Sequence, residues 1–143
     1  MSAEVRVETY DRIVEITIDR PPANAINQGV SNAIYEALSM LQEDDNLRVG
    51  IITGSGDRIF SAGWDLKEIA AIDNNEEAVN SAFTCPGGFA GISEFWSLKK
   101  PVISAINGMA VGGGFEIALA TDMIVAADHA EFFLPEMQRG FLP

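Results

Sequence analysis

The sequence predicts a mixed α/β fold built from repeated strand–strand–helix units. Two apolar segments with strand character, "EVRVETY" and "RIVEITI", open the chain, with a turn between them near Asp11. A helical segment and shorter repeats of the same rhythm follow, and this order favours ββα units over a doubly wound βαβ sheet. The chain has 143 residues, 48% of them hydrophobic, so we expect one domain spanning 1–143.

The first half of the chain continues with a loop, a helix and a short strand. The paired prolines of "DRPPANAIN" interrupt any strand ladder, so this stretch is a predicted loop. A helix is expected after Asn27, a suitable N-cap, because six apolar residues follow at helical spacing: Val30, Ala33, Ile34, Ala37, Leu38 and Leu41. "RVGIIT" predicts a buried strand and "GSGDRIFSAG" a glycine-rich loop. Asp65 can cap a further helix.

The second half repeats the pattern with shorter elements. "PVISAIN" and "MIVAA" predict strands, and "GGGFEIALATD" between them predicts a helix. The preceding stretch "DNNEEAVNSAFTCPGGFAG" combines an acidic run with a Pro-Gly-Gly turn, and we expect it to be the most mobile part. The chain stops at "RGFLP", directly after an apolar segment, and we therefore expect the natural protein to continue.

Charge and composition exclude several classes of function. The net charge of −12 argues against nucleic acid and anionic membrane surfaces as partners, because both favour clustered Lys and Arg. The single cysteine, Cys85, excludes an internal disulfide, and one histidine excludes a His-rich metal site. His129 is a predicted surface turn residue. No apolar run is long enough to span a bilayer, and the N-terminus is charged, so we expect a cytoplasmic protein.

Several local features are candidates for a site, and the glycine-rich helix start is the one that suits a negatively charged oxygen. The glycines at 112–114 precede a helix, whose first N–H groups are unpaired donors, although glycines there can also simply permit close packing. Gly63 precedes a capped helix start, which is a common structural arrangement. Glu116 stands among apolar neighbours, where a carboxylate is costly unless it has a partner or a role. Glu136, by contrast, follows Pro135 in a position that is normally solvated.

The chain resembles the crotonase (enoyl-CoA hydratase/isomerase) superfamily. The resemblance rests on "FSAGWDLKEI", "NGMAVGGGFEIALATDMIVAAD" and "FFLPEMQRGFLP", in that order and spacing, together with "RPPANAI" and "RVGIITG". It covers essentially all 143 residues. It implies a crotonase-like spiral of ββα units that lacks the C-terminal helical part of the family. "FSAGWDLK" and "PGGFAG" are most similar to members that act on crotonobetainyl-CoA and carnitinyl-CoA.

The resemblance also implies catalytic roles. Family members stabilise the enolate of an acyl-CoA thioester with two backbone N–H groups, which match Trp64 and Gly113. Two glutamates match Glu116 and Glu136, and such a pair can hold one water and act as base and acid in hydration or dehydration of a 2-enoyl-CoA. We therefore expect these carboxylates to approach each other at a cleft.

The substrate contacts follow from the same resemblance. The CoA moiety is expected to meet the backbone of two loops, at Ala23, Ala25, Ala62, Gly63, Asp65 and Leu66. Coenzyme A is then part of the substrate, and no separate cofactor or metal is expected. Trp64 and Trp96 could contact the trimethylammonium of a carnitine-type acyl group. For Trp96, core packing is the favoured interpretation.

Two alternatives stay open from the sequence. The complete protein could be a general enoyl-CoA hydratase or isomerase, which acts on an uncharged acyl group. The chain could also be an inactive fragment that only folds or assembles. Complete family members form homotrimers, often paired into hexamers, and the resemblance implies this assembly for the complete protein.

Overall fold

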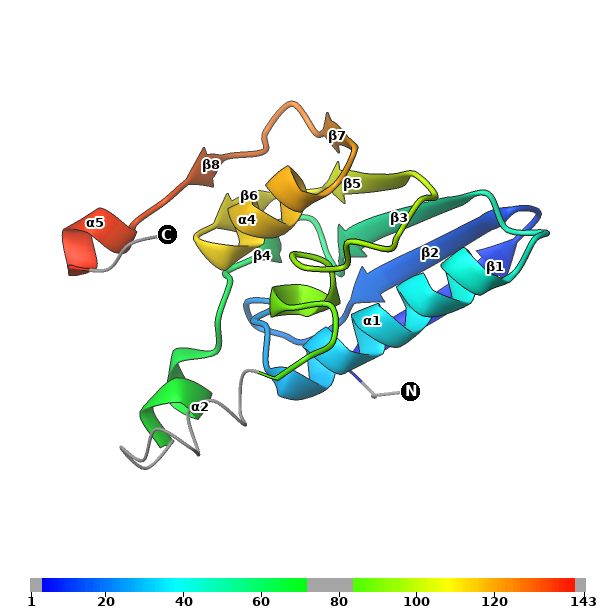
Figure 1. Ribbon diagram of the computed structural model, residues 1–143. Coiled ribbons are helices and arrows are strands. Elements are labelled where there is room, and N and C mark those ends of the chain that lie inside the picture. Colours follow the sequence, from blue (N-terminus) through cyan, green and yellow to red (C-terminus); the bar gives the residue numbers. More distant parts are fainter. Residues whose placement is uncertain (1–3, 72–83, 141–143) are drawn as a thin grey trace.

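A five-stranded sheet forms the larger layer of the molecule. The structure is a computed structural model that describes residues 4–71 and 84–140. The sheet has the order β1-β2-β3-β5-β7, with β1 antiparallel to β2 and the other pairs parallel (Figure 1). Its strands span Val5–Tyr10, Ile13–Ile18, Val49–Gly54, Val102–Ile106 and Met123–Ala126. The predicted strands and the turn at Asp11, which has a positive φ of 54°, are confirmed.

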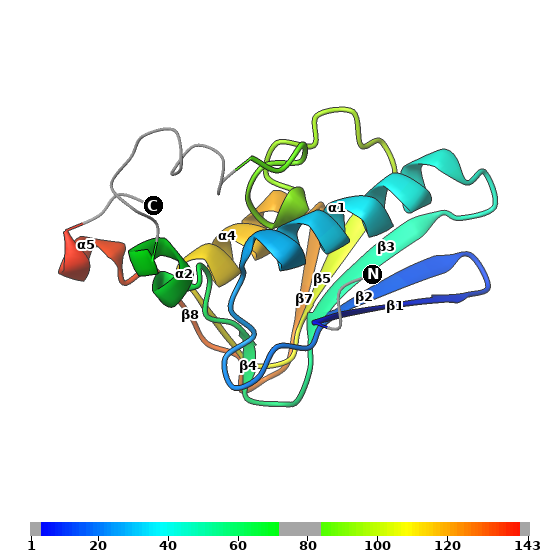
Figure 2. The ribbon, with the colours of Figure 1, turned by 90° about the horizontal axis from the view of Figure 1, so that it is seen from below.

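Helix α1, Gln28–Glu43, packs against this sheet (Figure 2). The Asn27 side chain caps it by accepting the Val30 N–H at 2.7 Å. All six apolar residues predicted to form its inner face are buried. At the other end, the Lys100 ammonium donates to the carbonyls of Leu41 and Asp44 at 2.8 and 2.6 Å, so a cation stabilises the negative end of the helix dipole.

A second, three-stranded sheet continues the fold beside the first. Strands β4 (Ile59–Ser61), β6 (Met109–Val111) and β8 (Phe132–Phe133) pair in parallel, in that order. The prediction of a loop over 54–63 is therefore wrong for β4. Phe60 is fully buried there, and this burial, together with pairing to a strand some fifty residues away, outweighs the flanking glycines.

Three short α-helices and one 3-10 helix complete the described fold. The α-helices are α2 (Leu66–Ala71), α4 (Gly113–Ala120) and α5 (Glu136–Arg139), and the 3-10 helix is η1 (Phe89–Gly91). Both ribbon views place α2, α5 and the N-terminal end of α4 at the same end of the molecule (Figures 1 and 2). The acidic part of the segment predicted to be mobile, with Asp73, Glu76 and Glu77, lies outside the described residues.

One edge of the fold carries uncovered apolar side chains. All four residues of β7 are exposed, and so are both residues of β8. The apolar neighbours of Glu116 indicate a largely buried helix, but Leu119, at the end of α4, is 61% exposed, so this is wrong for the last turn. Among residues 4–71 and 84–140, no helix has the length and apolar character needed to cross a membrane.

Candidate active site

Two loops that are far apart in sequence pair through their backbones. Ala62 N–H donates to the Ala23 carbonyl at 3.0 Å, and Ile26 N–H donates to the Gly63 carbonyl at 2.7 Å. Asp65 N–H returns a bond to the Ile26 carbonyl at 2.9 Å. The residues predicted to contact CoA, on 23–25 and 62–66, are therefore brought together on one short ladder.

The second of these loops packs directly on the start of α4. Gly63 has a φ of +80°, and a Cβ built on it would lie 2.6 Å from Gly113 N. Gly114 is equally close to the Ser61 carbonyl, whose atoms occupy the space that a side chain would need. These glycines therefore permit the close packing that the sequence left as one alternative, and they bring Gly63, the residue before Trp64, against Gly113.

The pairing pattern also fixes the direction of the Trp64 N–H. Ile26 and Trp64 form a parallel bridge in which Ile26 bonds to the residues on either side of Trp64. In a parallel ladder this pattern leaves the residue's own N–H pointing away from the bridging strand. Gly113 is the first residue of α4, so its N–H has no acceptor within the helix.

An ion-pair network holds the loop at Asp65. The Arg20 guanidinium contacts the carboxylates of Asp65 at 2.6 Å and Glu4 at 2.8 Å. The bond from Arg20 lowers the pKa of Asp65, and the N–H groups of Lys67 and Glu68 lower it further. Asp65 caps α2 through these two N–H groups, as predicted. Because its side chain and its backbone N–H are both hydrogen-bonded, Asp65 stabilises the conformation of the loop. The adjacent Leu66 side chain is 59% exposed.

The two predicted acids, Glu116 and Glu136, both lie beside the start of α4. Glu116 lies in the first turn of α4, where burial and then the nearby Glu136 carboxylate raise its pKa. Glu136 Oε1 fills the space that a Cβ on Gly112 would need, beside the start of α4. Glu136 Oε2 is buried and, among the described residues, has no hydrogen-bond partner. Two carboxylates that share one environment bind a proton more readily than two that are separate.

Aromatic rings flank the start of α4. The rings of Trp64 and Phe89 stack with centroids 4.3 Å apart and planes tilted by 34°. The Phe89 ring also lies 2.6 Å from the position that a Cβ on Gly113 would take. Trp96 is 86% exposed, so the interpretation of Trp96 as a core residue is wrong. Trp96 lies in a turn at the surface. The sequence does not indicate whether a single aromatic residue outside a periodic segment is buried or exposed.

Sequence reasoning missed three residues that shape this region: Arg20, Asn24 and Ser61. Arg20 joins Glu4 and Asp65, while Asn24 and Ser61 connect the two loops from the inside. Asn24 could have been found, because asparagine after paired prolines suits the positive φ of 49° that it adopts. Ser61 gives no local signal, since the hydrogen bond that links it to the other loop reaches a residue 37 positions away.

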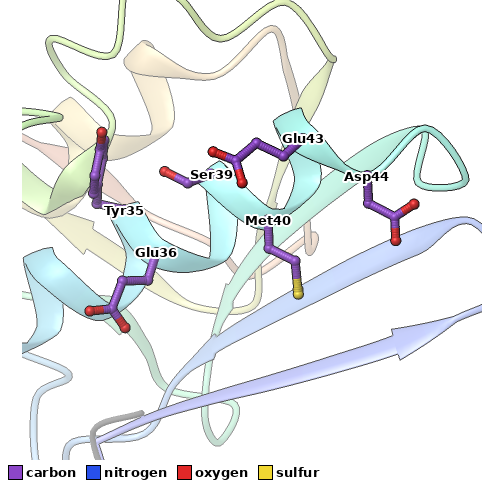
Figure 3. Close-up of a pocket in the computed structure, with 6 residues that line it drawn as sticks. All are labelled: Tyr35, Glu36, Ser39, Met40, Glu43 and Asp44. Carbon is purple, nitrogen blue, oxygen red and sulfur yellow. The ribbon is translucent and has the colours of Figure 1, made fainter.

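Two surface hollows lie outside the carboxylate pair. The larger, of about 520 Å³, is on α1 and is lined by Tyr35, Glu36, Ser39, Met40, Glu43 and Asp44 (Figure 3). The other, of about 420 Å³, is formed by residues 21–24 and 55–59. Neither is lined by Glu116 or Glu136, so the cleft expected at the two acids does not coincide with either hollow.

The remaining reactive side chains lie apart from the carboxylates. His129 is in an exposed turn, as predicted, and its Nε2 lies 2.9 Å from the Asp57 carbonyl. Cys85 is buried, and burial raises the pKa of its thiol. Within the described ranges, no three His, Cys, Asp or Glu side chains cluster in a way that could hold a metal ion.

Comparisons with known proteins agree on one family. A sequence profile described as enoyl-CoA hydratase/isomerase matches residues 8–143. A carnitinyl-CoA dehydratase from Salmonella arizonae is 52% identical over the whole chain, which covers 53% of that relative. The chain thus spans about half the length of the curated relatives it matches.

Solved structures share the fold over nearly the whole chain. An enoyl-CoA hydratase from Mycobacterium tuberculosis superposes with a TM-score of 0.85 at 42% identity, with 99% of this chain and 52% of that one covered. A carnitinyl-CoA dehydratase from Mycobacterium avium gives a TM-score of 0.82 at 41% identity, with coverage of 97% and 53%. The crotonase-like arrangement of ββα units predicted from the sequence is confirmed.

Proposed function

The chain belongs to the enoyl-CoA hydratase/isomerase family, and on this premise we propose that the complete protein hydrates a 2-enoyl-CoA thioester and catalyses the reverse dehydration. The observation that carries the proposal is the packing of the Gly63 loop on the first residue of α4, with Glu116 and Glu136 beside it. This packing supports the proposal, because two backbone donors and two carboxylates around one point are the groups that the reaction needs.

Trp64 N–H and Gly113 N–H are the proposed oxyanion donors. When water adds to the β-carbon, the electron pair of the double bond moves onto the thioester carbonyl and creates a negatively charged oxygen. Fixed N–H donors stabilise that charge without reorganising, and removing one such donor typically costs about 10²–10³ in kcat. The helix start at Gly113 contributes the positive end of its dipole to the same point.

Glu116 and Glu136 are the proposed acid–base pair. One carboxylate removes a proton from the bound water, whose oxygen bonds to the β-carbon, and the protonated partner delivers a proton to the α-carbon. The raised pKa of Glu116, caused by burial and by the nearby Glu136 carboxylate, supports Glu116 as a group that can hold and deliver a proton. Replacing either acid with glutamine is expected to lower kcat by about 10²–10⁴ and to leave CoA binding nearly intact.

The CoA moiety is proposed to lie along the ladder formed by the two paired loops. Ala62 N–H and Asp65 N–H are already bonded within that ladder. Recognition would therefore use the remaining backbone groups of residues 23–25 and 62–66, with the exposed Leu66 side chain as an apolar surface for the adenine ring. Titration with CoA alone should perturb the backbone amides of these residues in an NMR spectrum before those of α1.

A carnitine-type acyl group is the proposed substrate, because curated relatives that are 52% and 50% identical to this chain are named carnitinyl-CoA dehydratases. The Trp64 indole, stacked on Phe89 beside Gly113, offers an aromatic face to a trimethylammonium, an attraction of roughly 0.5–2 kcal/mol. The test measures kcat/KM of the Trp64→Leu variant for crotonobetainyl-CoA and crotonyl-CoA. A selective loss for the cationic substrate supports this assignment, whereas an equal loss for both favours a general enoyl-CoA hydratase.

The test of the function itself is the consumption of both thioesters by the protein as its gene encodes it, followed as loss of the conjugated enoyl absorbance. No turnover of either thioester by a folded sample would leave the alternative of an inactive fragment. Assembly into trimers or hexamers and a cytoplasmic location stay predictions, to be measured by light scattering and by cell fractionation.

A further inference from the structure

Ser61 is the one fully buried hydroxyl that the described residues place between the two paired loops. Its hydroxyl donates to the Asn24 carbonyl at 2.8 Å and accepts the Gly63 N–H at 3.1 Å. It lies at the end of β4, one residue before the turn that leads to Trp64. Both hydrogen bonds are shielded from water, so each is costly to lose.

The carbonyl that Ser61 binds is itself firmly held. Asn24 is 3% exposed, and its side-chain amide donates to the carbonyls of Ser55 at 3.1 Å and Ile59 at 2.9 Å. Its side-chain oxygen accepts the Arg20 N–H at 3.1 Å. Ser61 is therefore anchored to a rigid neighbour and not to a mobile loop.

This anchoring determines how the peptide between Gly63 and Trp64 is oriented. Ser61 holds the Gly63 N–H inward, and Ile26 N–H holds the Gly63 carbonyl at 2.7 Å. A trans peptide is planar, so the Trp64 N–H points opposite to that carbonyl. Because the N–H and the carbonyl of Gly63 are both held by hydrogen bonds, the orientation of the Trp64 N–H is restricted.

The same residue also sets the position of the second donor. The Ser61 carbonyl packs against Gly114, in the first turn of α4, with no room for a side chain between them. Ser61 thus contacts the start of α4 through its backbone and the Trp64 loop through its hydroxyl. A single residue fixes the two proposed donors relative to each other.

From these contacts we propose that Ser61 is a positioning residue, whose hydroxyl orients the Trp64 N–H toward the substrate carbonyl. The inference rests on the proposed function, because it assigns Ser61 a role in the same oxyanion site. Ser61 itself does not touch the substrate. Its loss should therefore weaken carbonyl polarisation and turnover more than substrate binding.

The test compares Ser61→Ala with wild type in the protein as its gene encodes it. The first readout is kcat and KM for crotonyl-CoA. The second is the absorption of bound cinnamoyl-CoA, a conjugated thioester whose spectrum shifts to longer wavelength when its carbonyl is polarised. We expect kcat to fall about tenfold or more, KM to change less than about threefold, and the spectral shift to shrink.

Two further variants separate orientation from general stability. Ser104→Ala removes another fully buried hydroxyl, which accepts from Thr121 at 3.1 Å away from the paired loops, and should leave kcat and the spectral shift unchanged. Ser61→Cys retains a weaker donor of similar size and should give intermediate values of both. It also keeps the test valid if Ser61→Ala does not fold.

The outcomes are distinct for the two proposals. Wild-type values of kcat and of the spectral shift in folded Ser61→Ala would overturn the positioning role while the oxyanion site stands. A fall in kcat with an unchanged shift would also overturn it, because Ser61 would then act on stability alone. A wild-type protein that neither hydrates crotonyl-CoA nor shifts the cinnamoyl spectrum would remove the proposed function, and this inference with it.

Discussion

At the scale of single residues, the environments of two titratable side chains shift their pKa values. Glu116 is the clearest case, since burial and the Glu136 carboxylate both raise its pKa. His129 is the opposite case, because neighbouring carbonyls favour its protonated form. Each of these shifts links the stability of the fold to pH in a direction that can be worked out.

Replacing Glu116 with glutamine is expected to stabilise the fold at neutral pH while it lowers activity. A carboxyl whose pKa is raised in the folded state binds its proton more tightly there, so stability falls as pH rises from the unfolded pKa through the folded one. Glutamine does not titrate, so Glu116→Gln does not lose stability in this way as pH rises. Its Tm should exceed that of wild type at pH 7, and the difference should disappear at pH values below the ordinary carboxyl pKa of about 4.3.

The exposed helix residue Glu36 provides the matched control, because Glu36→Gln removes a carboxylate of the same type from the surface of α1. Its effect on Tm should be small at both pH values. A Glu116→Gln variant that is less stable than wild type at pH 7 would show that the carboxylate is a structural partner and not a strained functional group.

His129 is expected to stabilise the fold more in mild acid than in base. Its Nε2 lies 2.9 Å from the Asp57 carbonyl and 3.2 Å from the Asn107 carbonyl, and the first of these is the largest cause of its raised pKa. A raised histidine pKa contributes stability that is complete below the unfolded pKa of about 6.5 and is lost as pH rises through the folded value. The Tm difference between wild type and His129→Ala should therefore be larger at pH 5.5 than at pH 8.5.

An Asp128→Asn variant separates the carbonyl contacts from the adjacent carboxylate, which lies 3.4 Å from Nδ1. In the Asp128→Asn background, the Tm difference caused by His129→Ala should keep most of its dependence on pH. An equal Tm difference between wild type and His129→Ala at both pH values would contradict the prediction.

At the scale of elements, the sequence predicted those segments whose signals are local. Helix α1 followed from its apolar period and from Asn27, and β1 and β2 followed from alternation around a turn. Strand β6 was missed and β4 was mistaken for loop, because three residues are too few to show a period and their pairing is decided by tertiary contacts. The glycines and acids of the site could be predicted by family resemblance, whereas Ser61 could not.

Two glycines with nearly the same positive φ allow backbone strain to be separated from contact. Gly63 has a φ of +80° and touches α4, while Gly56 has a φ of +82° with no atom within 4 Å of a built Cβ. Gly56→Ala should lose only the backbone preference, about 1–2 kcal/mol. Gly63→Ala should lose more in the free energy of unfolding, because its methyl group collides with Gly113.

Denaturant titration of both variants measures this difference, and turnover of crotonyl-CoA gives a second comparison. Gly56→Ala should keep wild-type kcat, and Gly63→Ala should lose activity because the two donors are pushed apart. Equal losses of stability in the two variants would mean that the loop can move away from α4 without penalty.

At the scale of the whole molecule, the two edges of the larger sheet differ in character. Strand β1 carries charged residues such as Arg6 and Glu8, which discourage pairing with another sheet. Strand β7 presents Met123, Ile124 and Val125, which are 52%, 43% and 62% exposed, and it has no charged residue. The β7 edge is therefore less protected against pairing than the β1 edge.

The 143-residue chain expressed alone is therefore expected to self-associate through β7. Val125→Lys should shift the mass measured by light scattering toward the monomer, because a lysine on an edge strand opposes strand pairing. Thr9→Lys places the same charge on exposed β1 and serves as the control, with no expected change in mass. A mass that is the same for wild type and both variants would exclude association through this edge.

The convergence of the two loops has a consequence for the order of folding. The bonds that join the two loops at the proposed donor site link residues 37 positions apart at Ser61 and Asn24 and 45 positions apart at Arg20 and Asp65. Contacts across such spans form only after the entropy of closing the intervening chain has been overcome, later than a local helix such as α1. The donors are then absent from early intermediates, and recovery of cinnamoyl-CoA binding during refolding should lag behind recovery of helical circular dichroism.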